Sequence, residues 1–96
     1  MKKALVIRFI EKKMSMYMRL SALDYQRGNY SDAHKFVERA CALGDIRKLV
    51  REGRYDDIKK HEREMSCHES TWISYWKVAN ELDEVDVFIK TNGFDR

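Results

Sequence analysis

Apolar residues recur every three or four positions along most of the chain, and this spacing predicts α-helices. The first predicted helix covers about residues 3–26. Its polar residues fall on one narrow stripe, and most of the remaining circumference is apolar: Val6, Phe9, Ile10, Met14, Met16, Tyr17, Met18, Leu20 and Leu23. A helix at the surface of a globular protein needs only roughly a third of its circumference to be apolar. We therefore expect this helix either to lie at the centre of the fold or to contact another chain.

Glycines and capping residues divide the rest of the chain into further helices. Gly28 follows the first helix, and Asn29 or Ser31 supplies a side-chain oxygen that can cap the second. Gly44 and Gly53 each mark a predicted helix end. The predicted segments are a second helix over about 30–43, a short third one over 45–52, a polar fourth one over 54–65, a turn over 66–70 and a long last helix over 71–92. The pattern thus predicts an all-α fold, a small bundle of four to five helices.

The composition fits a single helical domain over residues 1–96. The chain has no proline and four glycines, with 44% hydrophobic and 36% charged residues, as in folded rather than disordered proteins. The formal net charge is only +3, and basic and acidic residues are interspersed. The chain therefore lacks the dense positive charge of a dedicated nucleic-acid-binding protein, and nucleic acid is not an expected partner.

The N-terminal apolar run is short. It extends from Ala4 to Ile7 and is interrupted by Arg8, so it is too short for a signal-peptide core or a membrane span. We expect a cytoplasmic protein without membrane contact, in which Cys41 and Cys67 are reduced thiols.

The stretch RGNYSDAHKFVERACALGD, residues 27–45, is the most patterned part of the chain. The positions that carry the pattern, some of them just before this stretch, are Leu20, Ser21, Gly28, Tyr30, Ala33, Ala40 and the turn at Gly44–Asp45. Over residues 17–45 this pattern resembles a tetratricopeptide (TPR) hairpin, in which small residues let two antiparallel helices approach closely. Asp24 stands where that family usually has an aromatic residue, and no proline follows the second helix. The resemblance implies a TPR-like antiparallel hairpin and a protein partner.

The same hairpin is also similar to the start of HEPN domains, which are small helical bundles. Many HEPN domains are metal-independent ribonucleases that use an arginine followed, after four to six residues, by a histidine. The segment RYDDIKKH places Arg54 and His61 at this spacing, as two other Arg–His pairs of the chain do. The resemblance implies that His61 is a general acid–base toward a ribose 2′-oxygen and that Arg54 binds the phosphate. A metal-independent ribonuclease is therefore the enzymatic alternative.

Two sets of residues are candidates for binding a protein partner or a second copy of the chain. In the first helix, methionines supply an adaptable contact surface; the candidates there are Phe9, Lys13, Met14, Met16 and Met18. In the last helix, an aromatic cluster on one face is either core or interface; its members are Trp72, Tyr75 and Trp76. The acidic residues that follow this cluster would repel phosphate, which disfavours a nucleic-acid groove there.

Lys13 and Asp24 interrupt the apolar arc of the first helix. A lone buried charge is costly, so each is expected to be paired, to lie at the edge of the bundle, or to lie in a polar pocket. If two subunits meet along this helix, Lys13 or Arg8 would suit a small anionic ligand. An oligomer that binds or sequesters a nucleotide is therefore a further alternative.

No motif for a cofactor or a metal stands out. A glycine-rich phosphate loop and a nucleophile elbow are absent from the sequence, and His61, Cys67 and His68 lack the paired spacing of zinc ligands. A compact, proline-free chain without a catalytic motif is typical of small bacteriophage and mobile-element proteins. We predict a small non-catalytic binding or inhibitory protein that acts through a helical surface and forms homo-oligomers.

Overall fold

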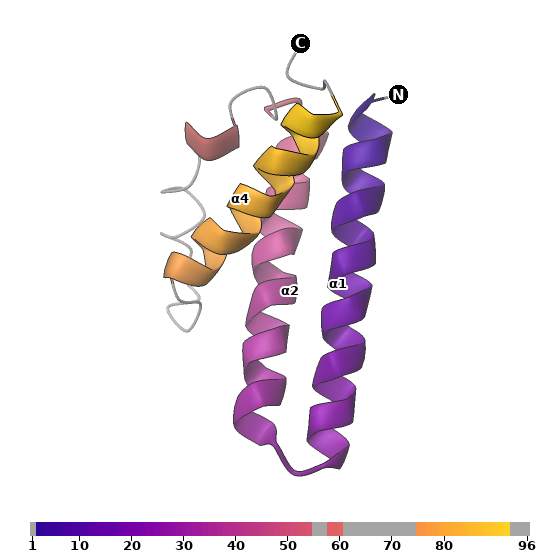
Figure 1. Cartoon of the computed structure of the whole chain (residues 1–96), viewed down its shortest axis with the longest axis vertical. Coiled ribbons are helices and arrows are strands. Elements are labelled where there is room, and N and C mark those ends of the chain that lie inside the picture. The colour runs from indigo at the N-terminus through magenta and orange to yellow at the C-terminus, as the bar shows by residue number, and fades with distance from the viewer. Residues whose placement is uncertain (1, 55–57, 61–74, 93–96) are drawn as a thin grey trace.

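The chain folds into α-helices that pack against one another (Figure 1). The computed structural model describes residues 2–54, 58–60 and 75–92, with side chains for all of these except residues 2 and 75–79. The elements are α1 (Lys2–Gln26), α2 (Tyr30–Arg51), one turn of 3₁₀-helix at 58–60, and α4 (Tyr75–Thr91). These ranges contain no strand, so the all-α prediction is confirmed for them.

α1 and α2 form an antiparallel hairpin (Figure 1). The chain reverses at Gly28, whose φ of 81° is a conformation that a Cβ atom disfavours. Asn29 occupies the N-cap position of α2, but its side chain makes no capping hydrogen bond. Near the loop, the buried Ser21 Oγ donates a hydrogen bond of 3.0 Å to the carbonyl oxygen of Ala33. The hydrogen bond joins the two helices directly, and the side chains at both positions are small.

The predicted helix end at Gly44 is wrong, because α2 continues through this residue. The glycine in the left-handed conformation is instead Gly53, with φ of 79°, just after the helix. A glycine inside a helix costs only roughly 1 kcal/mol relative to alanine. Continuing the helix buries the next turns, with Ile46, Leu49 and Val50 each at most 6% exposed, and this burial stabilises more. The second and third predicted segments are consequently one helix, and the described residues contain three α-helices rather than four to five.

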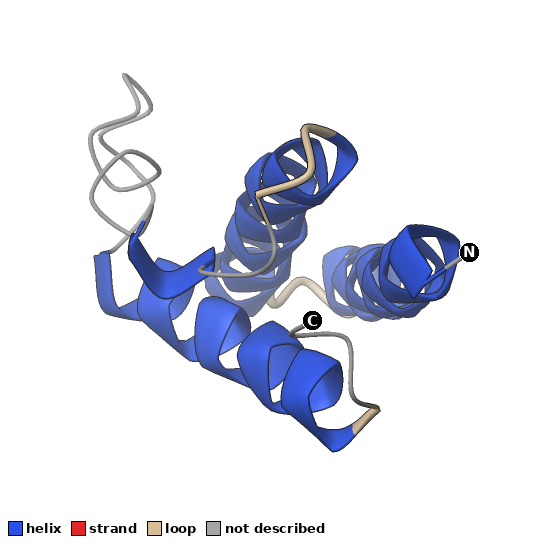
Figure 2. Cartoon of the chain, turned by 90° about the horizontal axis from the view of Figure 1, so that it is seen from above, coloured by secondary structure: helices blue, strands red, loops and turns tan. Residues whose placement is uncertain are grey.

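α2, rather than α1, is the central helix of the described fold. One side of α2 packs along α1 and another side contacts α4, as the view along the hairpin shows (Figure 2). The core residues come from all three helices and the 3₁₀ turn: Val6, Ile10, Tyr17, Ala40, Ala42, Leu43, Ile46, Leu49, Val50, Ile58, Leu82, Val85 and Ile89. α1 lies at the edge, with Leu5, Met16, Met18 and Leu23 between 45% and 50% exposed. The surplus apolar residues of α1 are therefore at the surface, not in the core.

Two predicted segments fall largely outside the described residues. Of the predicted helix over 54–65, the structure describes residue 54 and the 3₁₀ turn at 58–60, in which Ile58 is buried. The turn predicted over 66–70 and the first residues of the last helix, 71–74, lie outside the described ranges. The rest of that helix is present as α4.

Candidate functional site

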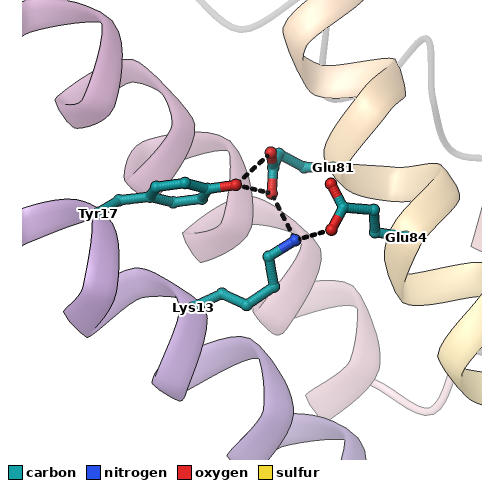
Figure 3. A network of polar contacts seen from close by, with 4 residues as sticks. All are labelled: Lys13, Tyr17, Glu81 and Glu84. Atoms are coloured by element: carbon teal, nitrogen blue, oxygen red, sulfur yellow. Dashed lines mark hydrogen bonds and ion pairs between the residues drawn. The ribbon is translucent and has the colours of Figure 1, made fainter. Parts of the chain in front are cut away.

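A polar network with a buried centre joins α1 to α4 (Figure 3). The Oη of Tyr17 donates a hydrogen bond to the carboxylate of Glu81, 2.9 Å from Oε2 and 3.2 Å from Oε1. The Nζ of Lys13 lies 3.3 Å from Oε1 of the same carboxylate and also donates a hydrogen bond to Glu84. Glu81 is 2% exposed and Tyr17 is 5% exposed, whereas Glu84 is at the surface. One lysine of α1 is thus held between two carboxylates of α4.

The network keeps its lysine charged and its phenol neutral. Burial by itself would lower the pKa of Lys13, but the hydrogen bond to Glu84 and the charge of Glu81 outweigh burial and raise this pKa above the usual 10.5. Burial raises the pKa of Tyr17 above the usual 10.0, and the hydrogen bond to Glu81 raises it further. Lys13 is therefore protonated at neutral pH, and a protonated amine is neither a nucleophile nor a base. This geometry fits a structural link between the two helices.

Lys13 meets the expectation that it is paired, but the sequence pattern does not reveal Glu81. Glu81 directly precedes Leu82 and lies four residues before Val85, at the edge of the buried face of α4. It is thus a lone anion on a mostly apolar helix face, as Lys13 is a lone cation on another. Matching the two isolated charges would have indicated the pair. In the described part of the chain, no buried side-chain nitrogen or oxygen lacks a hydrogen-bond partner.

The methionines of α1 lie on different sides of the helix. Met14 packs against the core, whereas Met16 is 46% exposed and Met18 is 50% exposed. Met16 and Met18 are two residues apart, which turns them by roughly 200° around the helix axis. Met14 and Met18 share one side. They line a groove between α1 and α2 of about 610 Å³, here called the α1–α2 groove, together with Glu11, Ser15, Arg19 and Arg47.

Charged and aromatic residues border the α1–α2 groove. Arg47 Nη1 lies 2.9 Å from Glu11 Oε2, whereas the side chain of Arg19 makes no ion pair with another described residue. Seven residues after Met18, and therefore on the same side of α1, Tyr25 is 61% exposed. Its ring packs edge to face against the ring of Tyr30, with the ring centroids 5.2 Å apart, and Tyr30 is also exposed. A strip of thioether and aromatic side chains thus extends from the groove to the hairpin loop.

Phe9 lies on the opposite side of α1 from Met18, since nine residues correspond to two and a half helical turns. Its ring stacks on Phe88 of α4, with the centroids 4.2 Å apart. The two rings lie in a second groove, of about 440 Å³, here called the α1–α4 groove. Its lining residues are Phe9, Asp83, Glu84, Val87, Phe88, Thr91 and Asn92. α1 therefore borders a groove on each of two opposite sides.

The remaining predicted site residues are only partly described. Trp72 and His61 lie outside the described residues, and Tyr75 and Trp76 begin α4 with side chains that are likewise not described. Arg54 is exposed, and its Nε lies 3.5 Å from Glu52 Oε1. The structure therefore shows the arginine of the predicted Arg–His pair and leaves the pairing untested.

The exposed thiol of Cys41 has a raised pKa, because its sulfur is partly desolvated and the carboxylates of Asp45 and Glu38 are near.

Across residues 2–54, 58–60 and 75–92, no group of three or more His, Cys, Asp or Glu side chains is arranged to hold a metal ion. Over the same ranges, no helix has an apolar run that would let it cross a bilayer.

The chain matches no protein-family model, and no curated protein or solved structure is similar enough to it to count as a match.

Proposed function

We propose that the protein is a non-catalytic binding protein that covers part of a partner protein with the α1–α2 groove and so inhibits it. The observation that carries this proposal is the groove itself. Met18 is half exposed, on a side of α1 where a surface helix of a soluble protein ordinarily carries a polar residue. A large apolar side chain in a groove, bordered by charged residues, is typical of a contact surface.

The residue types along this surface support a protein partner. Methionine, tyrosine and arginine are enriched in the buried centres of protein interfaces, and here Met14, Met18 and Arg19 line the groove while Tyr25 extends it. The thioethers adapt to a partner's shape because they are unbranched. Arg19 has no carboxylate partner within the described chain. The partner segment should therefore combine an apolar side chain for Met18 with an acidic side chain for Arg19.

The catalytic and nucleotide-binding alternatives have less support from the described residues. Arg54, the proposed phosphate ligand of a ribonuclease, faces the carboxylate of Glu52. The ammonium of Lys13 is held between Glu81 and Glu84, which would repel an anionic ligand. A ligand bound through Arg54 or Lys13 would have to compete with these carboxylates.

The test is a native mass spectrum of the protein isolated from the cells that produce it. We expect a protein partner bound in a fixed stoichiometric ratio. Met18→Glu should abolish its binding, because the added carboxylate would be buried against an apolar partner surface. Met16→Glu is the matched control, since it adds the same charge to the same helix on a different side. A partner that binds Met18→Glu as well as the wild type, or the absence of any protein partner, would contradict the proposal.

A further inference from the structure

The side of α1 that faces away from α2 carries basic and apolar residues together. Leu5, Arg8, Lys12 and Met16 follow one another at intervals of three and four residues, so they form one strip along the helix. We call these four residues the outer strip of α1. Leu5 is 49% exposed and Met16 is 46% exposed. No hydrogen bond or ion pair links Arg8 or Lys12 to another side chain in the described part of the chain.

The exposed side of α4 carries a strip of the same spacing and the opposite charge. Its members, here called the outer strip of α4, are Asn80, Asp83, Glu84, Val87 and Thr91. Val87 is 62% exposed, and the side chains of Asp83 and Glu84 are 53% and 56% exposed. Each carboxylate already has a lysine partner within the chain, Lys59 or Lys13. More than half of each remains open to solvent, so each can accept a second cation.

The opposite charges extend over the two whole helices. α1 contains six basic and two acidic residues, whereas α4 contains four acidic and two basic residues. A surface that carries both signs in separate areas attracts another copy of itself when the copies are turned so that unlike areas meet. The partner best matched to both strips is therefore a second copy of this chain.

The α1–α4 groove connects the two strips. Phe9 is four residues after Leu5 and seven before Met16, so it lies beside the outer strip of α1, and its ring stacks on Phe88 in the groove that Glu84 and Val87 also line. A two-fold axis near this groove would bring each strip onto the unlike strip of the other copy, and every contact would then occur twice.

We propose that two copies form a two-fold dimer in which the outer strip of α1 of each copy lies on the outer strip of α4 of the other. Arg8 and Lys12 face the carboxylates of Asp83 and Glu84, and an apolar end of the strip, Leu5 or Met16, enters the α1–α4 groove. This contact covers apolar surface that the chain itself leaves exposed. It uses neither Met14 nor Met18 of the α1–α2 groove, so the two contacts can be tested separately.

A charge-exchange experiment tests the dimer by sedimentation velocity at micromolar concentration. The wild type should sediment as a dimer. Arg8→Glu/Lys12→Glu places like charges together at both copies of the contact and should weaken association by roughly a hundredfold or more, as should Asn80→Lys/Asp83→Lys. An equimolar mixture of the two variants should restore a dimer, because both contacts of the mixed pair again join unlike charges. Circular dichroism checks that each variant remains helical.

Arg27→Glu/Lys48→Glu is the matched control for the first variant, because it changes the net charge equally at exposed positions outside the outer strips. It should remain a dimer. Met16→Glu should weaken the dimer and Met18→Glu should not, the reverse of their expected effects on the protein partner, so the two proposals can fail separately. A wild type that is a monomer or a larger assembly, a dimer that survives both charge reversals, or a mixture that restores no dimer would each overturn the inference.

Discussion

Tyr17 of α1 and Glu81 of α4 are separated by 64 positions in the sequence, and their side chains lie 2.9 Å apart, from Oη to Oε2. Both are buried, so the phenol supplies the hydrogen bond that the carboxylate has lost from water. This pair and the adjacent Lys13 form a polar link between α1 and α4. Four of the following predictions concern the stability of the fold, and the last concerns catalysis.

Tyr17→Phe should reduce the free energy of unfolding by about 1.5–3 kcal/mol, because it removes a buried hydrogen bond to a charged acceptor and leaves the ring in place. Chemical unfolding at neutral pH measures this difference. Tyr25→Phe is the control, since that tyrosine is 61% exposed and should tolerate the change. Equal stability of Tyr17→Phe and the wild type would show that the hydrogen bond contributes nothing.

Lys13→Met should destabilise the fold by about 3–5 kcal/mol, because it leaves the buried carboxylate of Glu81 without its counter-ion. Lys13→Met/Glu81→Gln should recover part of this loss, since the amide oxygen still accepts the hydrogen bond of Tyr17 and no buried charge remains. The double-mutant cycle should give a coupling energy within about 0.5–3 kcal/mol. Additive effects of the two substitutions would mean that the charges do not interact.

Alkaline pH should destabilise the protein through the same network. The pKa of Tyr17 is raised above 10.0 and that of Lys13 above 10.5 in the folded state. At a pH between the unfolded and folded pKa values, the folded protein therefore binds more protons than the unfolded protein. The stabilisation that the two groups contribute is complete below pH 10.0 and is lost as the pH rises through their folded pKa values. Unfolding free energies measured from neutral pH to well above pH 10.5 should decline, and less steeply in Tyr17→Phe. An unchanged or rising free energy across this window would contradict the prediction.

Gly44→Ala should stabilise the protein by about 0.5–1 kcal/mol, because alanine is the better helix former. A Cβ atom at this position would lie 3.7 Å from Met14 Cε, an ordinary contact distance. Gly28→Ala is the contrasting variant: it should destabilise, since Gly28 has φ of 81°. The two melting temperatures should move in opposite directions, and a loss of stability in Gly44→Ala would indicate that the position requires glycine.

The wild type should not cleave single-stranded RNA in the absence of metal ions, and His61→Ala and Arg54→Ala should leave that result unchanged. The expectation follows from the proposed binding function and from the ion pair of Arg54 with Glu52. Gel analysis of labelled RNA with a chelator present is the measurement. Reproducible cleavage that both substitutions abolish would establish the HEPN-like ribonuclease in place of the binding protein.

The sequence alone determined the local features of the fold. The predicted first helix, 3–26, differs by one residue from α1 (Lys2–Gln26), and Gly28 and Gly53 adopt the left-handed conformations expected after helix ends. These features depend on neighbouring residues: apolar spacing of three and four selects a helix, and glycine accepts the conformation that ends it. The candidate binding residues of α1 followed from the same pattern, because surplus apolar positions are visible in a single helix.

Only the tertiary structure decided which helix is central, whether α2 passes through Gly44, and which anion pairs with Lys13. Each outcome depends on contacts between segments far apart in the sequence. The helical preference of Gly44 is weak, and burial against other elements outweighs it. Glu81 and Lys13 meet because two helices cross where each has a charge on an apolar face, and their crossing depends on the packing of many side chains. A local pattern does not decide such contacts, because their free energy arises only when both segments are in place.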